Sequence, residues 1–209
     1  MAEAKPTARG AQISVLKPST RRIRTFVDRQ RQLEFNYPSV GATRDLDASA
    51  DGRMLGDYNV DAARVTVGRG SEAFARATEA IKRWKMFELG WVQLCWPDTR
   101  ICTGSAVAIL ARVARGWLLN ASRIAYTIEE TGSRDRYGFG YGTLPGHLLR
   151  GEEKFMVTWD RESNQVDFEL IAMSRPGQLF SWLSYPLVRR LQRRFRREAC
   201  QAMQRAVQP

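Results

Sequence analysis

The chain contains few of the residues from which metal centres and disulfide frameworks are built. Its 209 residues include one histidine, and its three cysteines, Cys95, Cys102 and Cys200, show no CxxC spacing. This excludes a multi-histidine metal centre, a zinc ribbon and a paired disulfide framework. We therefore expect no metal, no cofactor and a reducing, cytoplasmic location. No stretch of about 18 apolar residues occurs either, which excludes a single membrane-spanning helix.

The chain does contain enough apolar material for a folded domain. Hydrophobic residues make up 44% and aromatic residues 10% of the sequence, which excludes complete disorder, and the length suits one domain of ordinary size. Residues 1–16 lack the apolar run of a secretory signal and are predicted to form a disordered basic tail. We expect a single domain over residues 17–209.

The net charge of +11 is concentrated at the two ends of the chain. Residues 1–34 hold eight Lys/Arg and three acidic residues, residues 189–209 hold seven Arg and one Glu, and the stretch between them holds 18 residues of each sign. Excess positive charge favours an anionic partner such as a membrane surface or a nucleic acid. Such a partner would have to meet the terminal segments, because the body of the domain is electrically balanced.

The order of predicted elements indicates an α+β protein. Ser19 and Thr20 are typical of the start of a short helix. A short strand is expected near Ala63–Val67, followed by an amphipathic helix from Ser71 to about Phe87. Strands separated by short polar breaks then predict an antiparallel meander over Trp91–Trp96, Thr103–Val113, Trp117–Glu129, Tyr137–Leu144, Glu153–Asp160 and Val166–Ser174. With the long C-terminal helix, these elements predict a helix-grip fold, in which a curved antiparallel sheet of about six to seven strands wraps around that helix.

The C-terminal helix is amphipathic and basic. Its predicted apolar stripe consists of Leu187, Leu191, Phe195, Ala199, Ala202 and Ala206, and the opposite stripe consists of Arg190, Arg193, Arg194 and Arg197. Either the apolar stripe packs into the sheet while the arginines face water, which we favour, or the helix lies on an anionic membrane. A nucleic-acid partner is not expected, because base-reading aromatic motifs of the RNP type are absent from the sequence.

Aromatic residues and glycines alternate from residue 137 to residue 142. In a strand, this pattern places Tyr137, Phe139 and Tyr141 on one face and bare backbone on the other. The rings could form the wall of a ligand site, or the glycines could allow a sharply curved strand to approach the helix closely. Trp117 and Trp159 are further candidates for an aromatic wall.

Four polar residues are candidates for orienting a ligand: Arg123, His147, Glu152 and Arg175. The two arginines fall within predicted strands, where a charge on an apolar face needs a partner, and Glu152 or Glu153 could supply it. His147 is a weak candidate for an acid–base catalyst. No serine or cysteine is marked as a nucleophile by a motif such as GxSxG.

Several motifs in the sequence resemble those of a known family. They are Asn36–Arg44 (NYPSVGATR), Val67–Gly70, Tyr141–His147 (YGTLPGH), Gly151–Phe155 (GEEKF) and Ser174–Pro176. Together they resemble a family of bacteria and plants that is classed as a domain of unknown function. Some plant members of that family are described as plastid outer-envelope proteins with channel behaviour. The family is itself similar to the helix-grip superfamily of START and birch-pollen-allergen-like domains, which implies binding of apolar ligands.

The sequence thus predicts a protein that binds an apolar or amphipathic small molecule between the sheet and the C-terminal helix. Two alternatives stay open. The same cavity could belong to an enzyme of the cyclase or hydrolase kind, with His147 as acid or base. The protein could also be peripheral to a membrane or associated with a pore, acting through its basic C-terminal helix.

Overall fold

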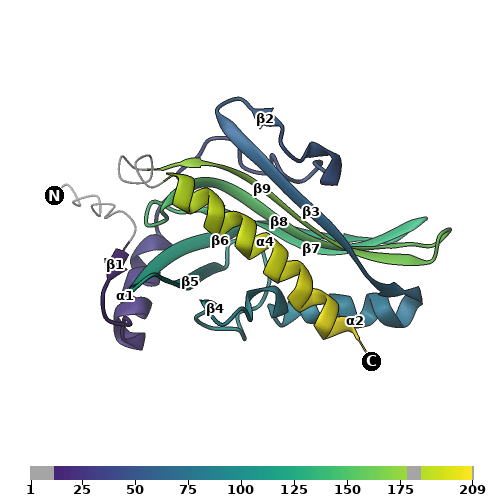
Figure 1. Cartoon of the computed structure of the whole chain (residues 1–209), viewed down its shortest axis with the longest axis horizontal. Helices are drawn as coiled ribbons and strands as arrows, with labels where there is room; N and C mark the ends of the chain where they lie inside the picture. The colour runs from purple at the N-terminus through teal and green to yellow at the C-terminus, as the bar shows by residue number, and fades with distance from the viewer. Residues whose placement is uncertain (1–11, 178–184, 209) are drawn as a thin grey trace.

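One twisted antiparallel sheet forms the body of the molecule (Figure 1). The computed structural model describes residues 12–177 and 185–208. Within that part, the sheet consists of β1 (Gln12–Ser14), β2 (Met54–Leu55), β3 (Tyr58–Arg69), β4 (Val92–Leu94), β5 (Ala106–Val113), β6 (Gly116–Glu130), β7 (Arg134–Thr143), β8 (Leu149–Asp160) and β9 (Gln165–Pro176). The helices are α1 (Thr20–Gln30), α2 (Gly70–Lys82) and α4 (Tyr185–Val207), with short 3-10 turns at η1 (Ala48–Ala50) and η2 (Lys85–Phe87).

The sheet is a meander closed by one long crossover. The strand order is β2-β3-β9-β8-β7-β6-β5-β4, with β1 paired to β6 beside this path. From β3 the chain passes through α2 and η2 to β4 at the far edge. It then returns strand by strand until β9 pairs with β3. The crossover therefore brings α2 and η2 to the same face of the sheet as α4.

The two faces of the sheet are covered by different elements. Its inner face packs against α2, η2 and α4, and it contributes the main core, which includes Phe139, Phe155 and Phe168. Its outer face packs against α1 at one end, where Leu119 and Ala121 meet Phe26. Because strand side chains alternate between faces, every second residue of β7 and β8 belongs to the inner core. In Figure 1, α4 crosses the sheet diagonally.

The helix-grip prediction is confirmed, although the structure holds more strands than expected. Two of them, β1 and β2, are only three and two residues long, too short to produce a recognisable alternation in the sequence. β1 falls within the segment predicted to be a disordered tail, and it pairs with Trp117–Leu119 of β6. The remaining tail, residues 1–11, lies outside the described residues.

The start of α1 follows the local sequence signal closely, and the predicted apolar stripe of α4 faces the sheet from Leu191 onward but not at Leu187. Ser19 caps α1, with its hydroxyl accepting from the Arg22 backbone N–H at 3.3 Å. In α4, Leu187 is 50% exposed while Val188 is buried. The inner stripe therefore begins one residue later than predicted, because both residues are apolar and only the contact with the sheet distinguishes them. No helix in the described part of the chain is long and apolar enough to cross a membrane.

Candidate functional site

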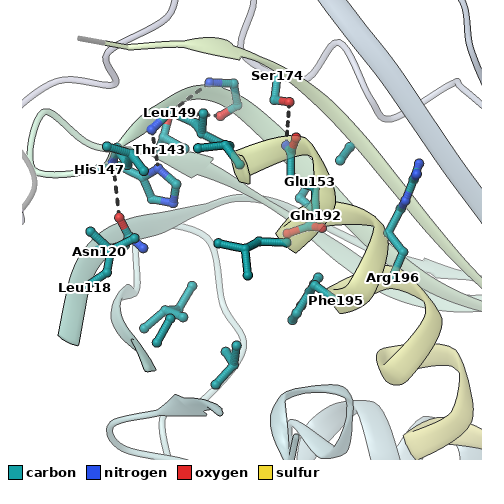
Figure 2. A pocket seen from close by; sticks show the side chains of 18 of the residues that line it. Leu118, Asn120, Thr143, His147, Leu149, Glu153, Ser174, Gln192, Phe195 and Arg196 are labelled. Atoms are coloured by element: carbon teal, nitrogen blue, oxygen red, sulfur yellow. Dashed lines mark hydrogen bonds between the residues drawn. The ribbon is translucent and has the colours of Figure 1, made fainter. Parts of the chain in front are cut away.

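A cavity lies between the first half of α4 and the inner face of the sheet (Figure 2). Its volume is about 170 Å³, which is below the several hundred Å³ typical of sites for drug-sized ligands. An apolar cavity of about 150 Å³ holds a benzene-sized ring. The lining is mostly apolar and comes from η2, β4, β5, β6, β9 and α4, including Phe87, Val92, Ile109, Leu118, Met173, Val188, Leu191 and Phe195.

The cavity ends where an aromatic cluster fills the core. The rings of Phe87, Phe155 and Phe195 lie 5.4–6.5 Å apart, and Phe139 stacks on Phe155 at 5.4 Å. Beyond Phe195, α4 contributes completely buried side chains such as Ala199 and Met203. The second half of α4 is thus packed tightly on the sheet, and the open space lies beneath its first half.

Glu153 is the carboxylate of β8 that faces this cavity. It lies directly opposite Tyr141 of β7, and the Tyr141 hydroxyl donates to its Oε2 at 2.5 Å. Burial raises the pKa of Glu153 to about 7, against the opposing effects of the Tyr141 hydrogen bond and of Arg196. A carboxyl group with this pKa exists in both protonation states near neutral pH.

A charged cluster borders the cavity beside Glu153. Asp61 of β3 is buried and pairs with two arginines of α4, Arg189 and Arg196. The Arg196–Asp61 distance, from guanidinium nitrogen to carboxylate oxygen, is 2.9 Å. Asp61 and Arg196 both line the cavity, so this cluster anchors α4 to β3 at the point where the helix covers the open space.

His147 also lines the cavity, from the loop between β7 and β8. Its Nδ1 accepts a hydrogen bond from the Leu149 backbone N–H at 3.0 Å, so the neutral ring carries its proton on Nε2. Burial lowers the pKa of His147 to about 4, and the ring is therefore neutral at physiological pH. Figure 2 shows the ring next to Asn120, whose Oδ1 accepts from the Leu148 backbone N–H at 3.1 Å.

The side chain of Glu152 points to the opposite, outer face of the sheet. Its carboxylate accepts four hydrogen bonds: from the Tyr37 hydroxyl at 2.7 Å, the Gly41 N–H at 2.7 Å, and the Thr43 N–H and hydroxyl at 2.9 and 2.5 Å. Glu152 is 2% exposed. All four donors belong to the loop before η1, so Glu152 fastens that loop to the sheet.

The glycines of β7 accommodate rings on the same outer face. A Cβ atom at Gly140 would overlap the Tyr126 ring, and one at Gly142 would overlap the Tyr37 hydroxyl. The predicted alternation is therefore present, with Phe139 and Tyr141 inward and bare backbone outward. Gly140 and Gly142 make room for tyrosines from β6 and from the loop before η1. The interpretation that the glycines allow the C-terminal helix to approach the strand is therefore wrong.

The structure brings only part of the predicted site together. Tyr141, His147 and Glu152 border the cavity, although the Glu152 carboxylate is directed to the outer face. Phe139 is fully buried in the aromatic cluster and is not a lining residue. Trp159 lies towards the far end of β8, against Phe74 and Asn164. Trp117 lies against Lys17.

Neither predicted arginine pairs with Glu152 or Glu153. Arg123 extends from the outer face, donates to the Leu33 carbonyl at 3.2 Å and covers the Phe35 ring. Arg175 pairs with Asp57 at 3.2 Å and covers the Tyr58 ring. The charged pairing beside the cavity is that of Asp61 with Arg189 and Arg196, and not one of Arg123 or Arg175 with Glu152 or Glu153.

Sequence reasoning did not place Asp61 or Arg196 at the cavity, and it named Glu153 only as an alternative to Glu152 as the partner of an arginine. A signal for Glu153 itself existed. Tyr141 and Glu153 lie opposite each other in the β7–β8 hairpin, so strand alternation would have placed Glu153 on the face of the predicted aromatic wall. Asp61 lies outside the strand expected over Ala63–Val67, since β3 begins earlier than its β-branched residues indicate.

The four arginines of the predicted basic stripe are all exposed on α4: Arg190, Arg193, Arg194 and Arg197. Arg194 pairs with Glu198 at 2.7 Å and covers the Trp91 ring at 4.6 Å. Arg189 and Arg196, at the flanks of the stripe, turn to Asp61. The helix thus separates arginines that hold it to the sheet from arginines that face solvent.

The sheet, the crossing C-terminal helix and the cavity beneath it define a helix-grip protein. Residues 36–202 match the model of a family described as a domain of unknown function, DUF1990. The chain belongs to this family. It is 32% identical over 203 residues to a UPF0548 protein of Dictyostelium discoideum, covering 91% of this chain and 94% of that relative.

Further relatives occur in a plant and a bacterium. A UPF0548 protein of Arabidopsis thaliana is 34% identical over 153 residues, covering 72% of this chain and 74% of that protein, and one of Deinococcus radiodurans is 35% identical over 203 residues, covering 91% and 96%. Similar solved structures include a hypothetical protein of Helicobacter pylori (TM-score 0.49, 9% identity, 72% and 88% covered). A major latex-like protein of Panax ginseng is also similar (TM-score 0.40, 13% identity, 74% and 100% covered).

Proposed function

We propose that the protein binds a small molecule that places an apolar group of about one ring in the cavity beneath α4. The observation that carries this proposal is the contrast within α4. Its second half is fully packed on the sheet, whereas its first half covers an apolar space of about 170 Å³. Larger hollows exist elsewhere on the described part of the chain, but the lining of this one is mostly apolar, and a concave apolar site with a few polar groups favours a small-molecule occupant.

The size of the cavity narrows the class of ligand. A volume close to that which holds benzene suits one ring or a short branched chain. A larger amphipathic molecule would bind by inserting only such a part. Apolar walls supply most of the affinity through burial of apolar surface, at about 25 cal/mol per Å², and a few polar groups supply orientation.

Native mass spectrometry of the freshly purified full chain tests the proposal. We expect an additional discrete mass that disappears on denaturation. A matched pair of variants locates it: Leu191→Trp fills the cavity from α4, while Leu187→Trp, one helical turn earlier, adds the same ring at an exposed position. Loss of the bound mass in Leu191→Trp alone supports the cavity. Equal retention in both variants would place the ligand elsewhere.

A second candidate function is peripheral attachment to an anionic membrane. The observation that favours it is the exposure of Arg190, Arg193 and Arg197 on one helix that also covers the cavity. Basic residues near an anionic surface contribute about 1 kcal/mol each. The charge would bring the cavity close to a source of apolar ligands.

Co-sedimentation with phosphatidylserine-containing vesicles tests this candidate. We expect binding at low salt that weakens as salt rises, because exposed charges are screened. Charge reversal of Arg190, Arg193 and Arg197 to Glu should abolish it. The same reversal of Arg21, Arg24 and Arg29 on α1, on the outer face, is the charge-matched control. Equal loss in both triple variants would show that only net charge matters.

A further inference from the structure

Most polar side chains around the cavity already have hydrogen-bond partners within the protein. The Ser174 hydroxyl accepts from the Gln192 amide at 2.9 Å, and the Thr143 hydroxyl bonds to the Asn36 side chain and the Gly151 backbone. The Asn120 side chain accepts from the backbone of Leu148. These bonds occupy oxygen atoms of the walls, whereas among the described residues Asn120 Nδ2 and His147 Nε2 have no acceptor.

Among the carboxyl groups that line the cavity, Glu153 is different, because half of its carboxyl group is unused. Its Oε2 accepts from Tyr141, while no residue in the described ranges 12–177 and 185–208 donates a hydrogen bond to its Oε1. Glu153 is partly buried and lines the apolar cavity, and its Oε1 is not among the buried side-chain atoms that lack a partner, so it stays open to a molecule that enters the cavity. A ligand that covers this oxygen would bury it, and a buried polar atom normally has a partner, so the free acceptor favours a ligand that brings a donor.

We propose that the ligand of this cavity carries a hydrogen-bond donor, a hydroxyl or a protonated amine, and that Oε1 of Glu153 accepts it. This inference rests on the proposed function and specifies its ligand class. Tyr141 acts as a positioning residue, since its hydrogen bond to Oε2 holds the orientation of the carboxyl group. Hydrogen bonds to an ionised acceptor are about twice as strong as neutral ones, so the donor distinguishes this ligand from a plain hydrocarbon of the same size.

The charges around Glu153 make this recognition dependent on pH. Tyr141 faces it from β7, Asp61 from β3 and Arg196 from α4, with Arg189 paired to Asp61 and His147 neutral across the cavity. Since Asp61 and the two arginines are ion-paired, Glu153 is the group of this set whose charge changes near neutral pH. A hydrogen-bond donor binds the ionised Glu153 carboxylate more tightly than the protonated form. The affinity of a donor-carrying ligand, relative to that of a hydrocarbon of the same size, should therefore rise between about pH 6 and pH 8.

Three probes of similar size test the inference: toluene, benzyl alcohol and benzylamine. Dissociation constants are measured by calorimetry or NMR titration on the full chain at pH 8. We expect benzyl alcohol or benzylamine to bind at least about fivefold more tightly than toluene. In Glu153→Gln that advantage should fall below about twofold, while the affinity for toluene stays within about twofold of wild type. Glu130→Gln, an exposed change away from the cavity, is the matched control and should bind as wild type does.

The experiment distinguishes a failure of the donor requirement, a failure of the role of Glu153 and a failure of the proposed function. Equal affinities of the three probes for wild type would overturn the donor requirement while supporting the cavity. A donor advantage that persists in Glu153→Gln would overturn the role of Glu153. Absence of binding by all three probes would overturn the proposed function itself.

Tyr141→Phe provides a second variant that keeps the carboxyl group. Removal of the hydroxyl takes away the bond that orients the carboxyl group and lowers its pKa, so the donor advantage should shrink without disappearing and should rise at higher pH than in wild type. The pH dependence of probe binding between pH 6 and pH 8 measures this. Complete loss of the advantage in Tyr141→Phe would assign donor recognition to the Tyr141 hydroxyl and overturn the role of Oε1.

Discussion

Two adjacent glutamates on β8 show how differently the two faces of this sheet are used. Glu152 points outward and is saturated by four hydrogen bonds from one loop, whereas Glu153 points inward and accepts one hydrogen bond from Tyr141. The outer carboxylate is part of the scaffold. The inner carboxyl group has a raised pKa. A buried charge is well accommodated only where its partners are complete, so the comparison separates a structural residue from a candidate binding residue.

Three of the motifs noted in the sequence meet at the outer glutamate. The segment Asn36–Arg44 supplies the donors to Glu152, the segment Tyr141–His147 supplies Gly142, against which Tyr37 packs, and Gly151–Phe155 supplies Glu152 itself. These motifs thus build one packed junction on the outer face of the sheet. Three residues of the same motifs, Tyr141, His147 and Glu153, lie at the cavity on the inner face.

The largest effect is expected from replacing the outer glutamate. Glu152→Gln replaces one accepting oxygen by an amide that confronts N–H and O–H donors. We expect it to lower the free energy of unfolding by about 3–5 kcal/mol, because breaking a buried charged network leaves groups unsatisfied. Urea unfolding at pH 7 measures it. A free energy of unfolding as high as that of Glu153→Gln at the same pH would contradict the contrast between the two faces.

Gly142→Ala tests the same junction from the neighbouring strand. The new Cβ would overlap the Tyr37 hydroxyl, which itself donates to Glu152. We expect a loss of about 2–3 kcal/mol in the free energy of unfolding, since overpacking forces neighbours to move. Gly132→Ala is the control, because nothing lies within 4 Å of a Cβ there; it should change stability by less than about 0.5 kcal/mol. Equal effects of the two substitutions would show that the junction can expand freely.

Glu153→Gln should stabilise the protein at alkaline pH. A folded-state pKa of about 7 lies above the unfolded value of 4.5, so the folded state binds more protons and wild-type stability falls as pH rises between these values. The neutral glutamine removes this loss, and we expect a gain of about 2–3 kcal/mol at pH 8 and little change at pH 4.5. Urea midpoints across this pH range measure the slope; parallel wild-type and variant profiles would refute the raised pKa.

His147→Gln probes the smallest of these effects, at acid pH. The folded-state pKa of about 4 lies below the ordinary value of 6.5, so the contribution of the neutral ring is present above pH 6.5 and is lost as pH falls towards 4. Glutamine still offers an acceptor for the Leu149 N–H without taking up a proton. We expect the variant to lose about 1–2 kcal/mol less than wild type between pH 7 and pH 5, measured by urea unfolding at both pH values. Equal losses would show that folding does not lower the pKa of His147.

Much of the fold could be predicted because its signals are local. The capping of α1 by Ser19, the positions of the long strands and the amphipathic C-terminal helix all follow from residues within one element. The site was predicted less well. Trp117, Trp159, Arg123 and Arg175 were chosen by residue type, but their places near strand ends or on the outer face keep them away from the cavity.

The sequence by itself determined that Glu152 and Glu153 occupy opposite faces, because strand side chains alternate, and that Phe139 and Tyr141 share one face. Only the tertiary structure decided which face is which. The donors to Glu152 come from a loop more than 100 residues earlier, and the helix over Glu153 follows after β9. Contacts between such distant segments leave no periodic trace in the sequence, and they decide which glutamate is locked into the scaffold and which one faces the cavity.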